Sequence, residues 1–249
     1  SSSGGQIYLS GGTSSVTTGG RIWVQSGVSD VKSSGVIGIQ TAASGTDGVS
    51  GFMVLSTGVS SNGNSGDLFM GSGASTNGRG GLLSVTVGSG NSGSGGDMLL
   101  TAGATSSDLA TATGGQMLLS AGTSSAQTGG RVFIQSGIGT DTTSGALGIV
   151  TSDSGSAGVS GYMVLSTGDS MNGNSGALFM GSGTSASGRG GSVYVSVGSG
   201  NSGSGGDVVV MAGTSSSSSG GQIYLSGGTS SVTTGGRIWV QSGVSDVKS

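Results

Sequence analysis

The sequence predicts an all-β fold, a β-solenoid made of coils of about 15 residues that forms part of a longer fibre. Two observations predict it: a short repeat punctuated by glycine, and an apolar triplet at a constant place in each repeat. A helix is excluded because three apolar residues between glycine pairs are too few to nucleate one, and each glycine in a helix costs roughly 1 kcal/mol.

The repeat has three levels. Residues 1–33 recur without change as residues 217–249, an offset of 216, so 1–249 is interpreted as one continuous array. A looser duplication makes GFMVLSTGVSSNGNSGDLFMGSG, which begins at Gly51, return as GYMVLSTGDSMNGNSGALFMGSG at Gly161. The shortest unit starts at the second residue of a GG or SG pair, and successive starts are 15 residues apart except for two spacings of 16 and one of 19. Such self-similarity indicates a repeat architecture.

Each unit, numbered from its first glycine, follows the pattern G-x-h-h-h-x-x-G and continues with about seven small polar residues. Positions three and five are always apolar, and because they point to the same side of a strand they are the predicted core. Position eight is glycine in 14 of 16 units, which suits a turn with positive φ or a close backbone approach. A coil of about 30 residues with two strands per turn remains an alternative.

Position four points away from the predicted core, yet it is apolar in 13 of 16 units. An exposed apolar stripe of this length predicts a lateral interface with a second copy of the chain. The alternative is that a larger coil folds over this side and makes it a second internal core. The aromatic residues assigned to the interface are Tyr8, Trp23, Phe69, Phe133, Phe179, Tyr194, Tyr224 and Trp239.

The string GGQIYLSGGTSSVTTGGRIWVQSG resembles the Gly/Ser/Thr-rich tandem repeats of large secreted proteins of diatoms, related algae and oomycetes. The resemblance covers the whole chain and implies a cell-surface, matrix or adhesive role. The period is also similar to that of small ice-binding solenoids, but those carry regular Thr-x-Thr ranks where this chain has Tyr8, Trp23, Val54 and Phe69.

The residues offer little chemistry, so the chain is predicted not to be an enzyme and to need no cofactor or metal. It has no His and no Cys, and its acids are ten scattered aspartates. One set, Asp67, Asp97 and Asp207, shares position two and is interpreted as a solvated strand edge rather than an acidic groove. Another set, Asp47, Asp108 and Asp153, lies in loops and is interpreted as solvated rather than calcium-binding.

The predicted function is therefore mechanical: a rigid extracellular filament that bundles and adheres, secreted as a fibre or held at a cell surface. The alternative is a repetitive binding module for ice or polysaccharide. The expected partners are further copies of the chain, side by side and end to end, and extracellular polysaccharide. A net charge of −3 without a basic patch argues against nucleic acid, and no apolar run is long enough to span a membrane.

Overall fold

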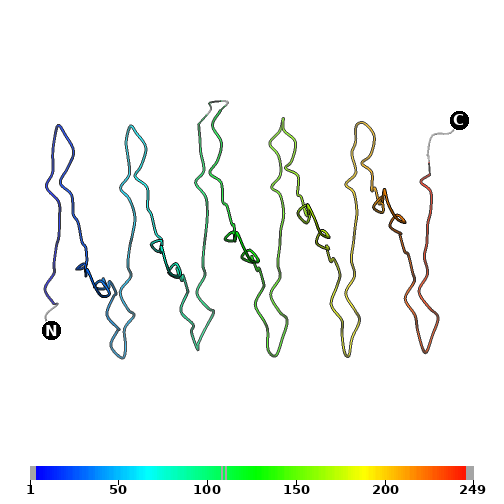
Figure 1. Ribbon diagram of the computed structural model, residues 1–249, viewed down its shortest axis with the longest axis horizontal. Coiled ribbons are helices and arrows are strands. Elements are labelled where there is room, and N and C mark those ends of the chain that lie inside the picture. The colour runs from blue at the N-terminus through cyan, green and yellow to red at the C-terminus, as the bar shows by residue number, and fades with distance from the viewer. Residues whose placement is uncertain (1–3, 108, 110, 245–249) are drawn as a thin grey trace. The chain divides into compact units, whose positions relative to one another are not determined.

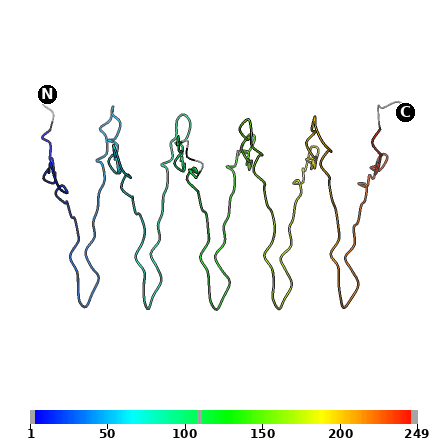
Figure 2. The same ribbon diagram turned by 90° about the horizontal axis from the view of Figure 1, so that it is seen from above.

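The computed structural model describes residues 4–107, 109 and 111–244, and in this part of the chain there is no helix and no β-strand. Figure 1 accordingly draws a plain ribbon without coils or arrows, and the view in Figure 2 agrees. The chain divides into two parts, Ser1–Ala121 and Gly122–Ser249, and each is built from the same local form. Extended segments, here called legs, cover positions one to eight of each unit and alternate with loops made of the polar residues.

The predicted all-β solenoid is wrong, in both its 15-residue and its 30-residue version. A stacked coil needs a ladder of backbone hydrogen bonds between neighbouring coils. In the described legs, no residue at positions two to six takes part in a backbone–backbone hydrogen bond. It also needs an interior, but none of the described residues is buried. The physical reason lies in the composition: 59 glycines lose much backbone entropy on ordering, and only two apolar side chains per unit are available to offset that loss.

The legs nevertheless keep the alternation expected of extended chain. Ile22 at position three is 48% exposed, whereas Trp23 at position four is 74% exposed. The duplicated sequence shows the origin of this difference. Ile7, which has no unit before it, is 101% exposed, but its identical counterpart Ile223 follows a complete unit and is 53% exposed. Each unit therefore shields position three of the next, although not enough to make a core.

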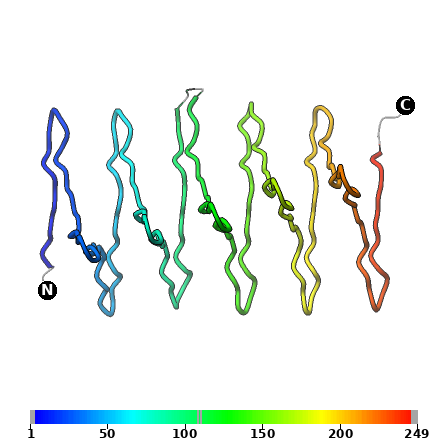
Figure 3. The backbone as a smooth tube through the Cα atoms, in the orientation of Figure 1, coloured from blue at the N-terminus to red at the C-terminus, as the bar shows by residue number. Residues whose placement is uncertain are grey.

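The legs meet at the bases of the loops, which we call necks. In seven necks of the described chain, the N–H of the glycine at position one donates to the C=O of the glycine at position eight of the preceding unit, with N···O distances of 2.7–2.9 Å. The pairs are Gly20–Gly12, Gly35–Gly27, Gly115–Gly103, Gly130–Gly122, Gly145–Gly137, Gly221–Gly213 and Gly236–Gly228. The tube in Figure 3 can be followed through these narrow bases.

The necks are also the best-packed places in the molecule. Nine of the described residues are partly buried rather than exposed, and seven of these occupy position seven, directly before the neck. These seven are Gly11, Ser26, Ala102, Ala121, Ser136, Ala212 and Gly227. The close approach explains the glycine at position one of this neck, since a Cβ on Gly20 would lie 2.6 Å from the backbone N of Gly12. Neither reason predicted for glycine at position eight is found there, because no described position-eight glycine has positive φ and a Cβ on Gly12 would meet nothing within 4 Å.

Positive φ occurs elsewhere. Among the described residues only Gly93 and Gly203 have it, at 78° and 80°, and both stand at position 13 of corresponding units. Eight other loops turn with the help of serine. In eight units the hydroxyl of the serine at position ten accepts the backbone N–H of position 13 at 2.9–3.1 Å, a turn in which the side chain replaces a backbone acceptor.

Eight other necks are open, because they lack the backbone bond between position one and position eight in the described chain. Their position-seven side chain lies against the next glycine instead: Thr41, Thr57, Ser72, Val87, Thr151, Thr167, Ser182 and Val197. In three of them the hydroxyl donates to the carbonyl of that glycine, as Ser72 Oγ does to Gly81 O at 2.8 Å. Two closed necks are thus followed by four open ones in residues 35–95, and three further closed necks are followed by four open ones in residues 145–205.

The neck bond leads to a first testable prediction. Gly221 and Gly5 stand in the same local sequence, but among the residues that the structure describes only Gly221 has a neck partner, Gly213 O at 2.9 Å. A hydrogen bond worth about 0.5–1.5 kcal/mol slows amide exchange about two- to twelvefold, so we expect the Gly221 amide to exchange more slowly than the Gly5 amide by this factor. Nuclear magnetic resonance of amide exchange measures both.

The matched variants are Gly221→Val and Gly5→Val. A Cβ at residue 221 would lie 3.2 Å from Gly213 N, whereas one at residue 5 would meet nothing within 4 Å. Only Gly221→Val should change the resonances of Gly213. Equal exchange at both glycines of the parent chain would contradict the neck.

Candidate lateral interface

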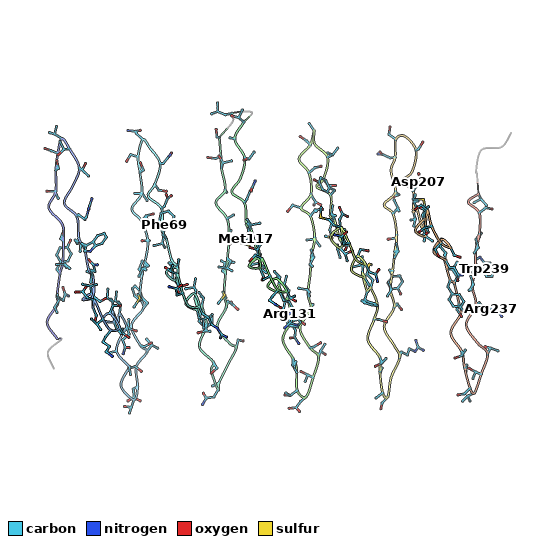
Figure 4. All side chains as sticks on the ribbon, viewed as in Figure 1. Phe69, Met117, Arg131, Asp207, Arg237 and Trp239 are labelled. Carbon is cyan, nitrogen blue, oxygen red and sulfur yellow. The ribbon has the colours of Figure 1, made fainter. Side chains whose placement is uncertain are left out.

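The eight aromatic residues predicted to form a lateral interface all lie at position four of a leg, and all are exposed. The most exposed is Phe179 at 92% and the least is Phe133 at 71%. Figure 4 labels Phe69 and Trp239 on the legs that carry them. The residues come from eight different legs, and none of them is buried against another, so the structure places them on the surface without gathering them into one cluster. Whether they contact a second copy stays a prediction.

Position four is therefore not the second internal core considered as the alternative, at least in the described single chain, because it has no covering layer. The predicted core at positions three and five is corrected in the same way. Leu9, Val24 and Ile39, which occupy position five, are exposed like the residues at position four. A single chain thus presents every apolar triplet to solvent on both sides of the leg.

The two tryptophans make a defined local contact. Trp23 Nε1 donates to Gln25 Oε1 at 3.1 Å, and Trp239 Nε1 donates to Gln241 Oε1 at 3.2 Å. Donor and acceptor occupy positions four and six, which face the same way in extended chain. The bond satisfies the indole N–H while the ring stays exposed. Since each glutamine accepts through its oxygen, its amide N–H groups remain available as donors.

The charged residues of the legs stand at position two. They are Arg21, Asp67, Asp97, Arg131, Asp207 and Arg237, and all are exposed. Figure 4 labels three of them, Arg131, Asp207 and Arg237, on separate legs. No group of three potential metal ligands occurs in the described part of the chain, and no pocket is found there. Of the loop acids, Asp47 and Asp153 are exposed, and Asp108 lies outside the described residues.

Two features of the site escaped the sequence interpretation. The first is the neck, for which the signal was present as paired glycines at positions eight and one with a small residue at position seven. The second is the serine turn, whose signal was the recurrence of serine at position ten. The glycines at position eight were interpreted as a turn with positive φ or a close backbone approach, and the serines as part of a polar loop, because no motif of this spacing is associated with a particular structure.

Comparison with protein-family models, with curated proteins and with solved structures finds no match to this chain. The described residues include no helix that could cross a membrane.

The tryptophan contact gives a second prediction. Gln25→Ala and Gln241→Ala remove the acceptor of the indole N–H, so each should shift the side-chain Nε1–H resonance of its own tryptophan, Trp23 or Trp239. Gln135→Ala is the matched control, because Gln135 occupies the same position next to Phe133, which has no donor. Unchanged indole resonances in both tryptophan-linked variants would show that the contact is not formed in solution.

Proposed function

We propose that this chain is a secreted structural protein whose copies associate side by side into a filament that bundles and adheres. One observation supports this most strongly: every apolar triplet of the described chain is exposed. Soluble monomers rarely expose contiguous apolar patches larger than a few hundred Å². The apolar positions recur in all 16 units, so the exposure is a property of the whole repeat rather than of one patch.

The accessible surface states the same point quantitatively. The chain exposes 25195 Å². A compact monomer of 23.3 kDa would expose about 9,700 Å², and a fully unfolded chain about 34,000 Å². The single chain therefore leaves most of its surface unburied. A standard protein interface takes only about 800 Å² from each partner, so there is ample apolar surface for association.

A second copy of the chain is the partner that fits best. It has the same 15-residue period, so an apolar triplet of one copy can meet an apolar triplet of the other at every unit. Charged residues make up only 7% of the chain, so repulsion between copies is weak. Any unrelated partner would need the same period to bury as many triplets, and this favours self-association.

The backbone of the legs points to the same partner. Positions two to six make no backbone–backbone hydrogen bond in the described chain, and proline is absent from the sequence. Extended segments of this kind, with β-branched and aromatic residues and little charge, tend to pair with other extended segments. The pairing proposed here is between separate molecules and is distinct from the solenoid that the structure excludes.

Secretion and a place in a fibre or at a cell surface belong to the proposal. They rest on the composition, which is rich in Ser, Thr and Gly and poor in Lys and Glu. No catalytic role is proposed, since the acids of the legs stand on separate units.

Polysaccharide binding is a second candidate function, favoured by the Trp–Gln contacts. An exposed indole ring can stack on the apolar face of a sugar, and the neighbouring glutamine amide can donate to a hydroxyl group. Arg21 at position two faces the same way as Trp23 and Gln25 and could pair with an acidic sugar. Binding to immobilised acidic and neutral polysaccharides, compared between the parent and Trp23→Ala/Trp239→Ala, tests this candidate. Ice binding has no comparable observation in its favour.

The third prediction tests self-association. Serine at all eight interface positions, Tyr8, Trp23, Phe69, Phe133, Phe179, Tyr194, Tyr224 and Trp239, should convert a chain that associates with rising concentration into a monomer. Each aromatic would contribute on the order of 1–3 kcal/mol if buried between copies. Sedimentation velocity over a concentration series measures the association, and infrared spectroscopy detects the accompanying pairing of extended segments.

The control replaces eight exposed apolar loop residues by serine: Val16, Val28, Val31, Val59, Ile138, Val159, Met171 and Val232. This variant loses as many apolar residues but keeps the legs intact, so it should associate like the parent. A parent chain that stays monomeric at all concentrations would refute the proposed function.

A further inference from the structure

We infer that self-association is strongest in two blocks of the chain, residues 35–95 and 145–205, and that the units between and around them, although some carry interface aromatics such as Trp23, contribute less to it. The inference rests on the proposed function, since it names the part of the chain that would contact a second copy. Each block contains four consecutive units with open necks. The partner is the corresponding block of another copy.

The first argument is the backbone at the necks. In a closed neck such as Gly115–Gly103, the N–H of position one and the C=O of position eight are bonded to each other. In the open necks of the described chain this backbone bond is missing. In three open necks a serine or threonine hydroxyl donates to the position-one carbonyl. The position-one N–H and the position-eight C=O are still not bonded to each other in these necks. The open blocks thus offer more backbone groups to a second chain.

The second argument is independent and concerns position two, which faces the same way as position four in extended chain. The units with closed necks all carry a polar or charged residue there: Gln6, Arg21, Asp97, Gln116, Arg131, Asp207 and Gln222. The units with open necks carry an apolar residue in six of eight cases: Val36, Phe52, Leu82, Ala146, Tyr162 and Ala177, with Asp67 and Ser192 as the exceptions. In an open block, the exposed side of a leg is therefore apolar at two positions instead of one.

The two patterns coincide unit by unit. Where the backbone groups of the neck are bonded to each other, the leg carries a polar or charged residue at position two. Where they are not, position two is mostly apolar. The apolar residues concerned are well exposed, with Val36, Phe52, Leu82 and Tyr162 between 88% and 92%. Charges on extended segments are a recognised means of preventing edge-to-edge pairing. Four of the seven closed units carry such a charge, at Arg21, Asp97, Arg131 and Asp207, whereas Asp67 is the only charge at position two of the open units.

A third feature distinguishes position seven. The open blocks have β-branched residues there in six of eight units, for example Thr57, Val87 and Val197, whereas no closed neck does. β-branched residues favour extended pairing, and the Val87 Cγ1 lies only 2.7 Å from where a Cβ on Gly96 would be, so this side chain fills the neck. Closure of the neck and pairing with a second chain therefore compete for the same backbone groups. The residue at position seven influences which of the two occurs.

The experiment compares two variants that lose the same number of apolar residues. The block variant changes Val36, Phe52, Leu82 and Tyr162 to Gln. The spacer variant changes Leu99, Leu118, Val209 and Met211, which are exposed residues of closed units outside the eight interface aromatics, to Gln. Sedimentation velocity measures the concentration at which half of the chain is associated. We expect the block variant to raise this concentration at least tenfold and the spacer variant to change it less than twofold.

The outcomes separate the two proposals. An equal or larger effect of the spacer variant overturns the preference for the two blocks and leaves self-association intact. A parent that does not associate overturns the proposed function itself. A second arm tests the neck without touching the apolar face: Val87→Ala/Val197→Ala should allow these necks to close and weaken association, and Ala102→Val/Ala212→Val should open closed necks and strengthen it. If both double variants change association in the opposite direction, or leave it unchanged, the necks do not have the role assigned to them.

Discussion

The neck hydrogen bond, from the glycine at position one to the carbonyl of position eight in the preceding unit, organises the chain more than any other interaction. In seven necks of the described chain it joins the two ends of a polar loop. It tolerates insertion, since the 19-residue unit still brings Gly115 N to 2.8 Å from Gly103 O. Because the bond spans a fixed short loop, its entropic cost is small, and it can form without any contact between distant units.

A chain held together only at necks cannot bury its apolar residues. Each leg is shielded in part by the unit before it, as the contrast between Ile7 and Ile223 shows, but no second layer covers it. In most proteins the apolar residues are buried within one chain, because two layers pack around a core. Here the apolar surface remains outside in the described chain, and under the proposed function a second copy supplies the burial that stabilises an ordered structure. This is why a structural, self-associating role suits the chain better than the role of an independent domain.

Under the proposed self-association, the division into closed and open necks would give the chain a way to limit association. A uniform array of exposed apolar legs would associate along its whole length and in any register, with aggregation as the result. Polar residues such as Arg21 and Asp97 at position two interrupt that uniformity at regular intervals. The interrupted pattern favours one register, in which open blocks lie against open blocks.

The sequence by itself determined the period, the division of each unit into leg and loop, the alternation along the legs and the exposed place of Tyr8, Trp23 and the other position-four aromatics. These are local properties, set by residue type and by the two-residue repeat of extended chain. Only the tertiary structure decided between stacking and neck closure. Glycine backbone at positions one and eight can bond either to the next coil or across its own loop, and both choices satisfy the same sequence pattern. The outcome depends on the balance between chain entropy and the few apolar contacts per unit, a non-local sum that no single motif such as the Gly12–Gly20 spacing reveals.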